Sequence, residues 1–259
     1  MMGWIARWGG YARSSVRPPN RLTANRMPRK IGVSNCLACP IRGVSIFAGL
    51  TLEDLRRLDI PVVTLAYGPG EAFYHEDARA AAAYTLRSGV VKLTRALPSG
   101  RQQIVRLLRT GDIFGFEGLL DSRYHHSAVA LDECHVCRLS LPELNALSRA
   151  NASVREALTQ RWAAALRQAE GLVMELGAKR ASQRLASFLL HWCRHADGAH
   201  WTALPLTRQE LGELLGLTVE TTSRCLADWK RQGIIEERAG GIRLRDLEAL
   251  QEHAGPMHT

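Results

Sequence analysis

A segment near the C-terminus constrains the fold of this chain more than any other part of its sequence. Thr207 and Glu210 form a T-x-x-E capping box, which predicts a helix that begins just after Thr207. Gly216 then ends that helix, and Thr218 caps a second one, which should end at Gly233. Two short helices joined by a tight turn indicate a helix-turn-helix.

The residues after Gly233 extend this prediction. Two β-like runs, IIEER and GIRLR, flank the pair Gly240-Gly241, which favours a two-residue hairpin turn. A hairpin that follows the second helix at this distance is typical of the wing in a winged helix-turn-helix. We expect the buried face of the first helix to consist of three leucines, Leu211, Leu214 and Leu215.

The second helix of this motif presents polar residues on one face. Glu220, Ser223 and Arg224 lie at positions i, i+3 and i+4, near its N-terminus. Arginine can donate two hydrogen bonds to guanine, a carboxylate can accept one from cytosine, and serine can bond either kind of base edge. We therefore expect this face to enter the major groove of DNA. The alternative is an exposed Glu–Arg pair on an ordinary helix.

Other residues of the motif have predicted roles as well. The core side of the second helix should be formed by Val219, Leu226 and Trp229. Further DNA contacts, mainly to phosphates, are expected from Thr207, Arg208, Gln209, Thr218, Thr221, Lys230 and Arg231.

Composition is compatible with this prediction and excludes other classes. The chain has 34 Lys+Arg and 25 Asp+Glu, a formal charge of +9, which suits a polyanionic partner such as double-stranded DNA. It contains no P-loop, no G-x-S-x-G, no H-E-x-x-H and no dinucleotide fingerprint, so an enzyme is not expected. It also lacks a long apolar run or a secretory signal, so we expect a cytoplasmic protein without a membrane span.

The chain of 259 residues is long enough for two domains. Residues 1–30 have no sustained periodicity, and we expect them to be disordered, or to precede a true start at Met27. After a short helix capped by Thr51, β-like runs separated by turn residues continue to Leu141. They predict a small antiparallel barrel or roll, and thus an α+β protein.

A longer helical period follows Asn151. Its apolar positions alternate steps of four and three, as in a coiled coil: Leu158, Trp162, Ala165, Ala169, Leu172 and Leu176. We expect this stripe to form a homodimer interface; the alternative is packing on the chain's own β domain. The predicted division is an extension at 1–30, a sensory roll at 31–145, a dimerisation helix at 150–177, a winged helix-turn-helix at 178–250 and a tail at 251–259.

This order of elements resembles the Crp/Fnr superfamily of bacterial transcription regulators over nearly everything after residue 31. The E-x-x-S-R run at 220–224, within LGLTVETTSRCL, resembles the Fnr branch. The resemblance implies a cyclic-nucleotide-binding-like roll and a homodimer on a palindromic operator with TTGAT-like half-sites. It also implies RNA polymerase as a partner.

The roll is the predicted sensory domain, and its sequence argues against cyclic AMP. Cyclic-nucleotide-binding members of the superfamily hold the phosphate with an arginine that precedes serine or threonine. In this chain the comparable stretch, GFEGLLDSRYHHSAVAL, has His126 before Ser127. A neutral imidazole is a poor substitute for a bidentate guanidinium group.

Cysteines suggest a different signal, namely oxygen or redox state. Cys36 and Cys39 form one C-x-x-C pair, and Cys134 and Cys137 form another. Four thiolates can hold an iron–sulfur cluster, of the 4Fe–4S or 2Fe–2S type, or zinc. The Fnr branch has a third cysteine where this chain has Ser45.

Cys134 could take the place of the missing third cysteine only if a bulge or turn brings its side chain to the strand face that carries Cys137. Residues three apart on a regular strand face opposite sides. A dithiol switch, structural zinc and cysteines without a role remain alternatives. The alternative function is a Crp-like regulator without a metal cluster that is gated by a small molecule or is constitutively active. Cys193 and Cys225 should be buried small hydrophobes.

Overall fold

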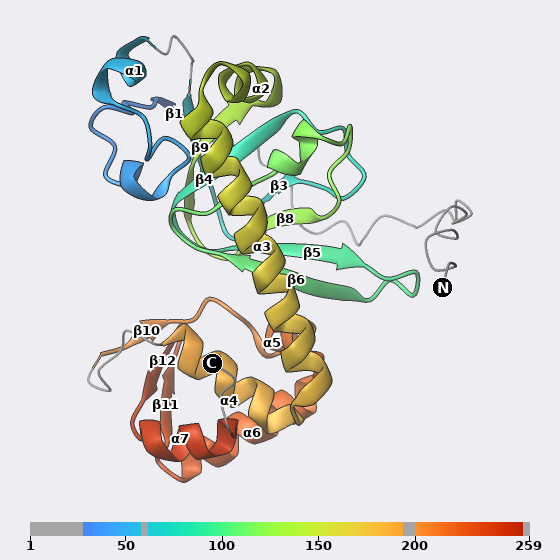
Figure 1. Ribbon diagram of the computed structural model, residues 1–259. Coiled ribbons are helices and arrows are strands. Elements are labelled where there is room, and N and C mark those ends of the chain that lie inside the picture. Colours follow the sequence, from blue (N-terminus) through green and yellow to red (C-terminus); the bar gives the residue numbers. More distant parts are fainter. Residues whose placement is uncertain (1–27, 58–61, 194–199, 256–259) are drawn as a thin grey trace, which may run out of the picture.

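The computed structural model of the protein describes residues 28–57, 62–193 and 200–255. Two lobes are joined by one long helix, which lies across the N-terminal lobe and reaches the C-terminal lobe (Figure 1). The predicted α+β order of antiparallel roll, long helix and winged helix-turn-helix is confirmed. Within the described ranges, no helix is both long and apolar enough to cross a bilayer.

The N-terminal lobe is a roll of two antiparallel sheets. One sheet has the order β1 (Arg29–Val33), β2 (Val63–Tyr67), β9 (Cys134–Ser140), β4 (Ala82–Ser88) and β7 (Ile113–Phe114). The other has the order β3 (Ala72–Tyr74), β8 (Ser127–Ala130), β5 (Val91–Ala96) and β6 (Gln102–Leu108). Alternate residues of the strands face inward, so that β9 buries Cys134 and Val136 while Cys137 lies on the other side.

Aromatic rings fill the space between the two sheets. Phe73 contacts Tyr67, Tyr84 and Phe114 with ring centroids 3.9, 5.6 and 5.1 Å away. Short helical pieces close the ends of the roll: η1 (Arg42–Val44), α1 (Leu52–Arg57), η2 (Phe116–Leu119) and α2 (Leu141–Ala150). The predicted cap of α1 is confirmed, because the Thr51 hydroxyl accepts the Asp54 N–H at 3.1 Å.

The long helix α3 (Ala152–Ala178) begins at Asn151, whose side chain accepts the Val154 N–H. Its first turns bury Val154 and Leu158 in a cluster with residues of the roll and α2. The remainder of α3 leaves the roll and extends to the C-terminal lobe (Figure 1). The helix is thus anchored at its start and exposed over much of its length.

The C-terminal lobe surrounds a second apolar core. Its elements are α4 (Ala181–Trp192), β10 (Thr202–Ala203), α5 (Arg208–Leu215), α6 (Val219–Arg231), β11 (Ile235–Arg238), β12 (Gly241–Leu244) and α7 (Leu247–Ala254). The leucines predicted for α5 are buried, as are Leu226 and Trp229 of α6. Strands β10, β12 and β11 form a small antiparallel sheet that includes the wing.

Several boundaries differ from the sequence prediction. Strand β1 begins at Arg29, within the segment expected to be an extension, while residues 1–27 lie outside the described part. Helix α7 reaches Ala254, so the expected tail contributes buried side chains. The wing turn consists of Ala239 and Gly240, one position earlier than predicted, because Arg238 pairs with Gly241. Helix α2 was not predicted, although Ser140 and Glu143 form a capping box.

Candidate nucleic-acid interface and sensor site

Helix α6 begins with the cap that its sequence predicts. The Thr218 hydroxyl accepts the Thr221 N–H at 3.1 Å, which satisfies one of the free amides of the first turn. Glu220 is fully exposed, and its pKa is lowered by hydrogen bonds from its own backbone N–H and from the Thr218 hydroxyl. A carboxylate at this end is also stabilised by the helix dipole. The Glu220 side chain is therefore an ionised acceptor at neutral pH.

The structure places the predicted base-contacting residues on one accessible side of α6. Glu220 and Arg224 are exposed and Ser223 is half-buried. Val219, which was expected in the core, is instead 43% exposed. Thr222 takes the buried position, and it can do so because its hydroxyl donates to the Thr218 carbonyl at 3.0 Å.

Two glycines allow α5 and α6 to approach closely. Gly216 has φ +64°, a left-handed conformation that favours glycine and ends α5 where predicted. A Cβ atom on Gly212 would lie 2.6 Å from the Leu217 carbonyl oxygen, which is too close for any side chain. The requirement for glycine at position 212 has no local sequence signal, because it arises only from the packing of the turn on the helix.

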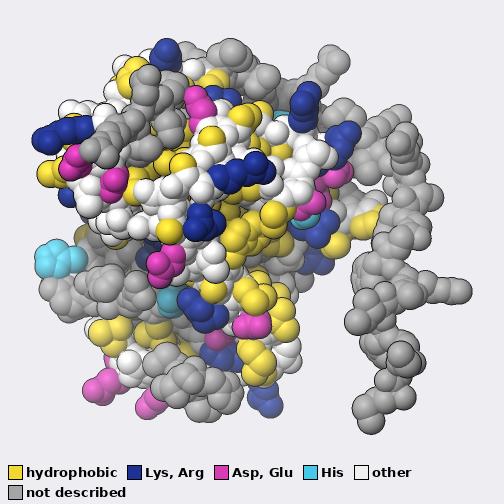
Figure 2. Space-filling view, turned by 45° about the horizontal axis from the view of Figure 1, so that its top comes forward, with side chains coloured by type: hydrophobic (Ala, Val, Ile, Leu, Met, Phe, Trp, Pro, Cys, Tyr) yellow, Lys and Arg dark blue, Asp and Glu magenta, His cyan; other side chains and the backbone are white. Residues whose placement is uncertain are grey.

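The predicted phosphate-contacting residues lie at the start of α5 and the end of α6. Arg208 pairs with Glu237 of the wing at 2.6 Å, and Gln209 donates to Glu213 at 2.9 Å. At the other helix, Lys230 is exposed and Arg231 pairs with Asp228. On the face seen in Figure 2, basic side chains are scattered among acidic ones over both lobes.

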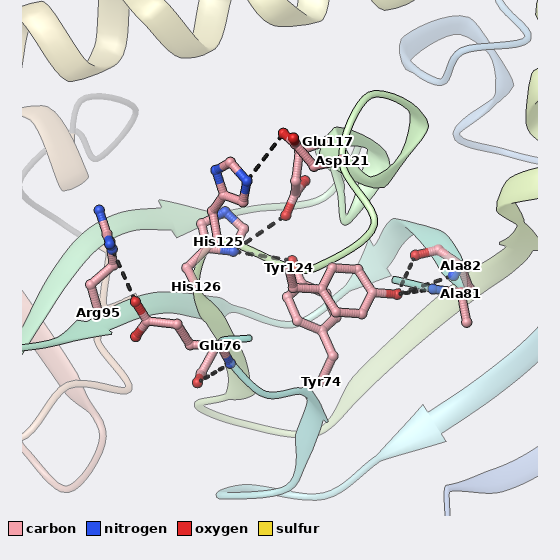
Figure 3. A network of polar contacts seen from close by, with 11 residues as sticks. Tyr74, Glu76, Ala81, Ala82, Arg95, Glu117, Asp121, Tyr124, His125 and His126 are labelled. Carbon is pink, nitrogen blue, oxygen red and sulfur yellow. Dashed lines mark hydrogen bonds and ion pairs between the residues drawn. The ribbon is translucent and has the colours of Figure 1, made fainter. Parts of the chain in front are cut away.

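Inside the roll, a buried polar network includes His126, the residue at the place of the phosphate-binding arginine. The Tyr124 hydroxyl donates to the Ala82 carbonyl at 2.8 Å, and its ring stacks on Tyr74 with centroids 3.7 Å apart (Figure 3). His126 Nδ1 lies 3.4 Å from Glu117 Oε1. Burial lowers the pKa of His126, so the imidazole is neutral at neutral pH. A neutral imidazole lacks the two parallel donors with which an arginine binds a phosphate group.

The four cysteines of the predicted cluster do not come together. Cys134 is fully buried between the sheets, and its thiol donates to the Val90 carbonyl at 3.3 Å. Burial and the neighbouring Asp132 raise the pKa of the Cys134 thiol to about 12. The bulge needed to turn this residue toward Cys137 is absent from β9, which stays paired residue by residue with β2. Cys134 is a residue of the roll interior.

Cys36 and Cys137 pack against the same apolar cluster, on the side of β9 opposite to Cys134. Burial raises the pKa of Cys36, and the nearby thiols of Cys137 and Cys39 raise it further. Cys137 Sγ lies 3.3 Å from the Ser34 hydroxyl and 3.8 Å from Arg87 Nη1. These three cysteines, Cys36, Cys39 and Cys137, are called the thiol group below.

The thiol group lacks a fourth ligand in the described part of the chain. Ser45, at the place of the third family cysteine, is buried, donates to the Arg42 carbonyl at 2.9 Å and accepts the Phe47 N–H at 3.1 Å. No set of three or more His, Cys, Asp or Glu side chains within the described residues is arranged to hold a metal ion. This arrangement does not fit the predicted four-cysteine iron–sulfur cluster. Of the other two cysteines, Cys193 is buried as predicted and Cys225 is half-buried.

The apolar stripe of α3 differs in register from the predicted one. Leu158 is buried on the roll, and the Leu176 side chain lies 3.5 Å from the place of a Cβ atom on Gly216. The exposed apolar residues on one side of α3 are instead Trp162, Leu166, Ala169 and Val173, spaced by four, three and four. We call these four residues the α3 stripe. Leu166 and Val173 are 61% and 69% exposed.

A winged helix-turn-helix attached to an antiparallel roll by a long helix defines a DNA-binding regulator with a sensory domain. The Crp-like helix-turn-helix domain family matches residues 183–253, and the cyclic nucleotide-binding domain family matches residues 64–151. The nitrogen fixation regulation protein FixK of Bradyrhizobium diazoefficiens is 31% identical over 222 residues, covering 83% of this chain and 93% of its own. The chain belongs to the Crp/Fnr family of transcription regulators.

Other similar proteins agree with this assignment. The transcriptional regulatory protein btr of Bordetella pertussis is 29% identical, over 89% of this chain and 97% of its own. The structure of FixK2 from Bradyrhizobium japonicum has a TM-score of 0.70 at 32% identity, covering 76% of this chain and 99% of its own. These relatives are regulators rather than enzymes. The protein is therefore a DNA-binding transcription regulator, of a family that acts as dimers.

Proposed function

We propose that the protein binds a palindromic operator with TTGAT-like half-sites, through Glu220, Ser223 and Arg224 of α6. The observation that carries this proposal is that a firmly capped helix leaves Glu220 and Arg224 exposed on one side. Arg224 would donate to the guanine, and Glu220 would accept from the cytosine that pairs with that guanine. The exposed Val219 suits an apolar contact with a thymine methyl group.

A binding titration tests this proposal. We expect a duplex with two TTGAT half-sites to bind at least ~1,000-fold more tightly than a scrambled duplex of equal length at physiological salt. Fluorescence anisotropy with labelled duplexes would measure both affinities. Equal affinity for the two duplexes would contradict sequence recognition by α6.

We also propose that the α3 stripe is the homodimer interface. It shares Trp162 and Ala169 with the six residues expected from sequence and adds Leu166 and Val173. The stripe has coiled-coil spacing, and its own chain leaves Leu166 and Val173 exposed, while Trp162 also packs on Phe116 with ring centroids 4.7 Å apart. A second copy of the same helix fits it because Ala169, in the middle, allows close approach of two helices. We propose that this dimer acts in the cytoplasm and contacts RNA polymerase at promoters.

We further propose that the signal is the redox state of the thiol group. An oxidant would take two electrons and two protons from two of the thiols, which then form one disulfide bond. Support comes from Cys36 and Cys137, which pack against the same apolar cluster of the roll, and from Cys39, three residues from Cys36. Cyclic AMP is disfavoured as the signal, because the neutral imidazole of His126 stands at the place of the phosphate-binding arginine.

We expect the Cys36→Ser variant to bind its operator equally well before and after exposure to air, whereas the wild-type protein changes its affinity. Cys193→Ser is the matched control, because Cys193 is a buried cysteine of the other lobe, and it should keep the wild-type response. Anaerobic purification with iron and zinc counts, followed by thiol titration and anisotropy in air, provides the measurement. A wild-type protein that ignores air would contradict the redox signal, and bound iron would contradict the disulfide mechanism.

A further inference from the structure

The hairpin of β5 and β6 extends from the roll and contacts the DNA-binding lobe. Ile104 of β6 is fully buried in the apolar core that the C-terminal lobe surrounds, and Leu107 packs beside it. The Gln103 side chain donates to the Leu214 carbonyl at the end of α5, at 3.4 Å. The roll thus holds α5 directly, in addition to the covalent connection through α3.

An ion pair completes this contact at the opposite end of α5. Lys92 Nζ on β5 lies 2.8 Å from Glu210 Oε1, and only 14% and 17% of the two side chains remain exposed. Burial alone would raise the pKa of Glu210, but the hydrogen bonds from Lys92 and Thr207 lower it. The pair is therefore charged at neutral pH and largely shielded from solvent, where ion pairs are screened less than on the surface.

Glu210 has two partners at once. Its Oε2 atom accepts the Thr207 N–H at 2.9 Å in the capping box, while Oε1 accepts from Lys92. Lys92 therefore holds the carboxylate that fixes the first turn of α5. This turn carries Thr207, Arg208 and Gln209, which are proposed to contact phosphates.

Near Lys92 and Glu210, apolar packing alone does not fix the orientation of one lobe relative to the other. A cleft of about 440 Å³ lies between them, lined by residues of both, including Lys92, Leu131, Pro205 and Glu210. The ion pair bridges this cleft. The exposed residues of α6, Glu220 and Arg224, remain uncovered while the pair is formed, so the contact is compatible with DNA binding.

We infer that Lys92 is a positioning residue for DNA binding: through Glu210 it sets the orientation of α5, and with it the helix-turn-helix, relative to the roll. This inference rests on the operator binding proposed above. Lys92 also neutralises a carboxylate that would otherwise repel the phosphates bound near Thr207. The same pair couples the roll, where a signal is received, to the domain that contacts DNA.

A double-mutant cycle on the intact protein tests the inference. We expect Lys92→Gln to weaken operator binding by about 5-fold or more, a typical size for coupling between domains. Glu210→Gln retains an acceptor for the capping box but removes the charge, and should weaken binding similarly. The double variant should be no worse than either single one, because both remove the same interaction. Lys92→Arg should restore much of the affinity.

Arg95→Gln is the matched control, because Arg95 lies on the same strand and pairs with Glu76 of the roll at 3.1 Å. It should leave operator affinity unchanged. Two results would overturn the inference, because both indicate direct phosphate contact by Lys92. One is that the effects of Lys92→Gln and Glu210→Gln on operator affinity add. The other is that the operator affinity of Lys92→Gln depends less steeply on salt than that of the wild-type protein. Unchanged affinity of Lys92→Gln would also overturn it, whereas failure of the wild-type protein to bind the operator would instead refute the proposed function.

Discussion

Replacing Arg224 by alanine is expected to lower affinity for the operator by roughly 5- to 150-fold per half-site, the equivalent of the about 1–3 kcal/mol that a bidentate base contact contributes to discrimination. The exposed guanidinium group of Arg224 stands on the open side of α6, beside Glu220 and Ser223. Binding to random DNA should change much less, because it depends on phosphate contacts elsewhere. Anisotropy titrations with operator and scrambled duplexes give both affinities.

Arg231→Ala is the control for this prediction. Arg231 carries the same charge at the other end of α6, where it pairs with Asp228. Its removal should weaken binding to both duplexes alike and reduce the salt dependence. If Arg224→Ala instead lowered operator and random binding by the same factor, Arg224 would be a phosphate contact, and the base assignment would be wrong.

Placing a charge on the α3 stripe is expected to convert the dimer into a monomer. In Leu166→Glu, two carboxylates would have to be buried against each other along the paired helices, which is strongly unfavourable. The monomer would bind only one half-site at a time, and the loss of simultaneous binding should lower operator affinity by roughly 100- to 10,000-fold. Sedimentation and anisotropy would measure the two effects on the same sample.

Gln168→Glu controls for the added charge, since Gln168 is exposed on α3 outside the α3 stripe. This variant should remain a dimer with wild-type affinity. A Leu166→Glu protein that still sediments as a dimer and binds the operator would show that another surface forms the interface.

Local signals in the sequence predicted the DNA-binding lobe well. The caps at Thr207 and Thr218 and the left-handed turn at Gly216 depend on nearby residues only, so they are visible in the sequence. The burial of Thr222 in place of Val219 was missed, because an apolar residue is ordinarily assigned to the core. A threonine can occupy a core position only where a backbone carbonyl accepts its hydroxyl. In α6 the Thr218 carbonyl accepts the hydroxyl of Thr222, and this bond forms only once the helix is folded.

Interactions between distant segments were predicted less well. The α3 stripe differs in part from the apolar positions expected from sequence, because an apolar period does not show that the roll covers Leu158. Cys134 was assigned to a cluster because of its spacing from Cys137, whereas the alternation of β9 directs it into the roll. The ion pair of Lys92 and Glu210 joins residues 118 positions apart. No local pattern indicates such a contact.

Selection of bound sequences from random duplexes tests most directly whether a dimer contacts DNA through Glu220, Ser223 and Arg224. We predict that the wild-type protein enriches an inverted repeat whose half-sites resemble TTGAT and lie about one helical turn apart. Arg224→Ala should enrich a repeat in which the guanine position is no longer specified. Enrichment of a single unrepeated site, or of a guanine that persists in the Arg224→Ala pool, would contradict this account.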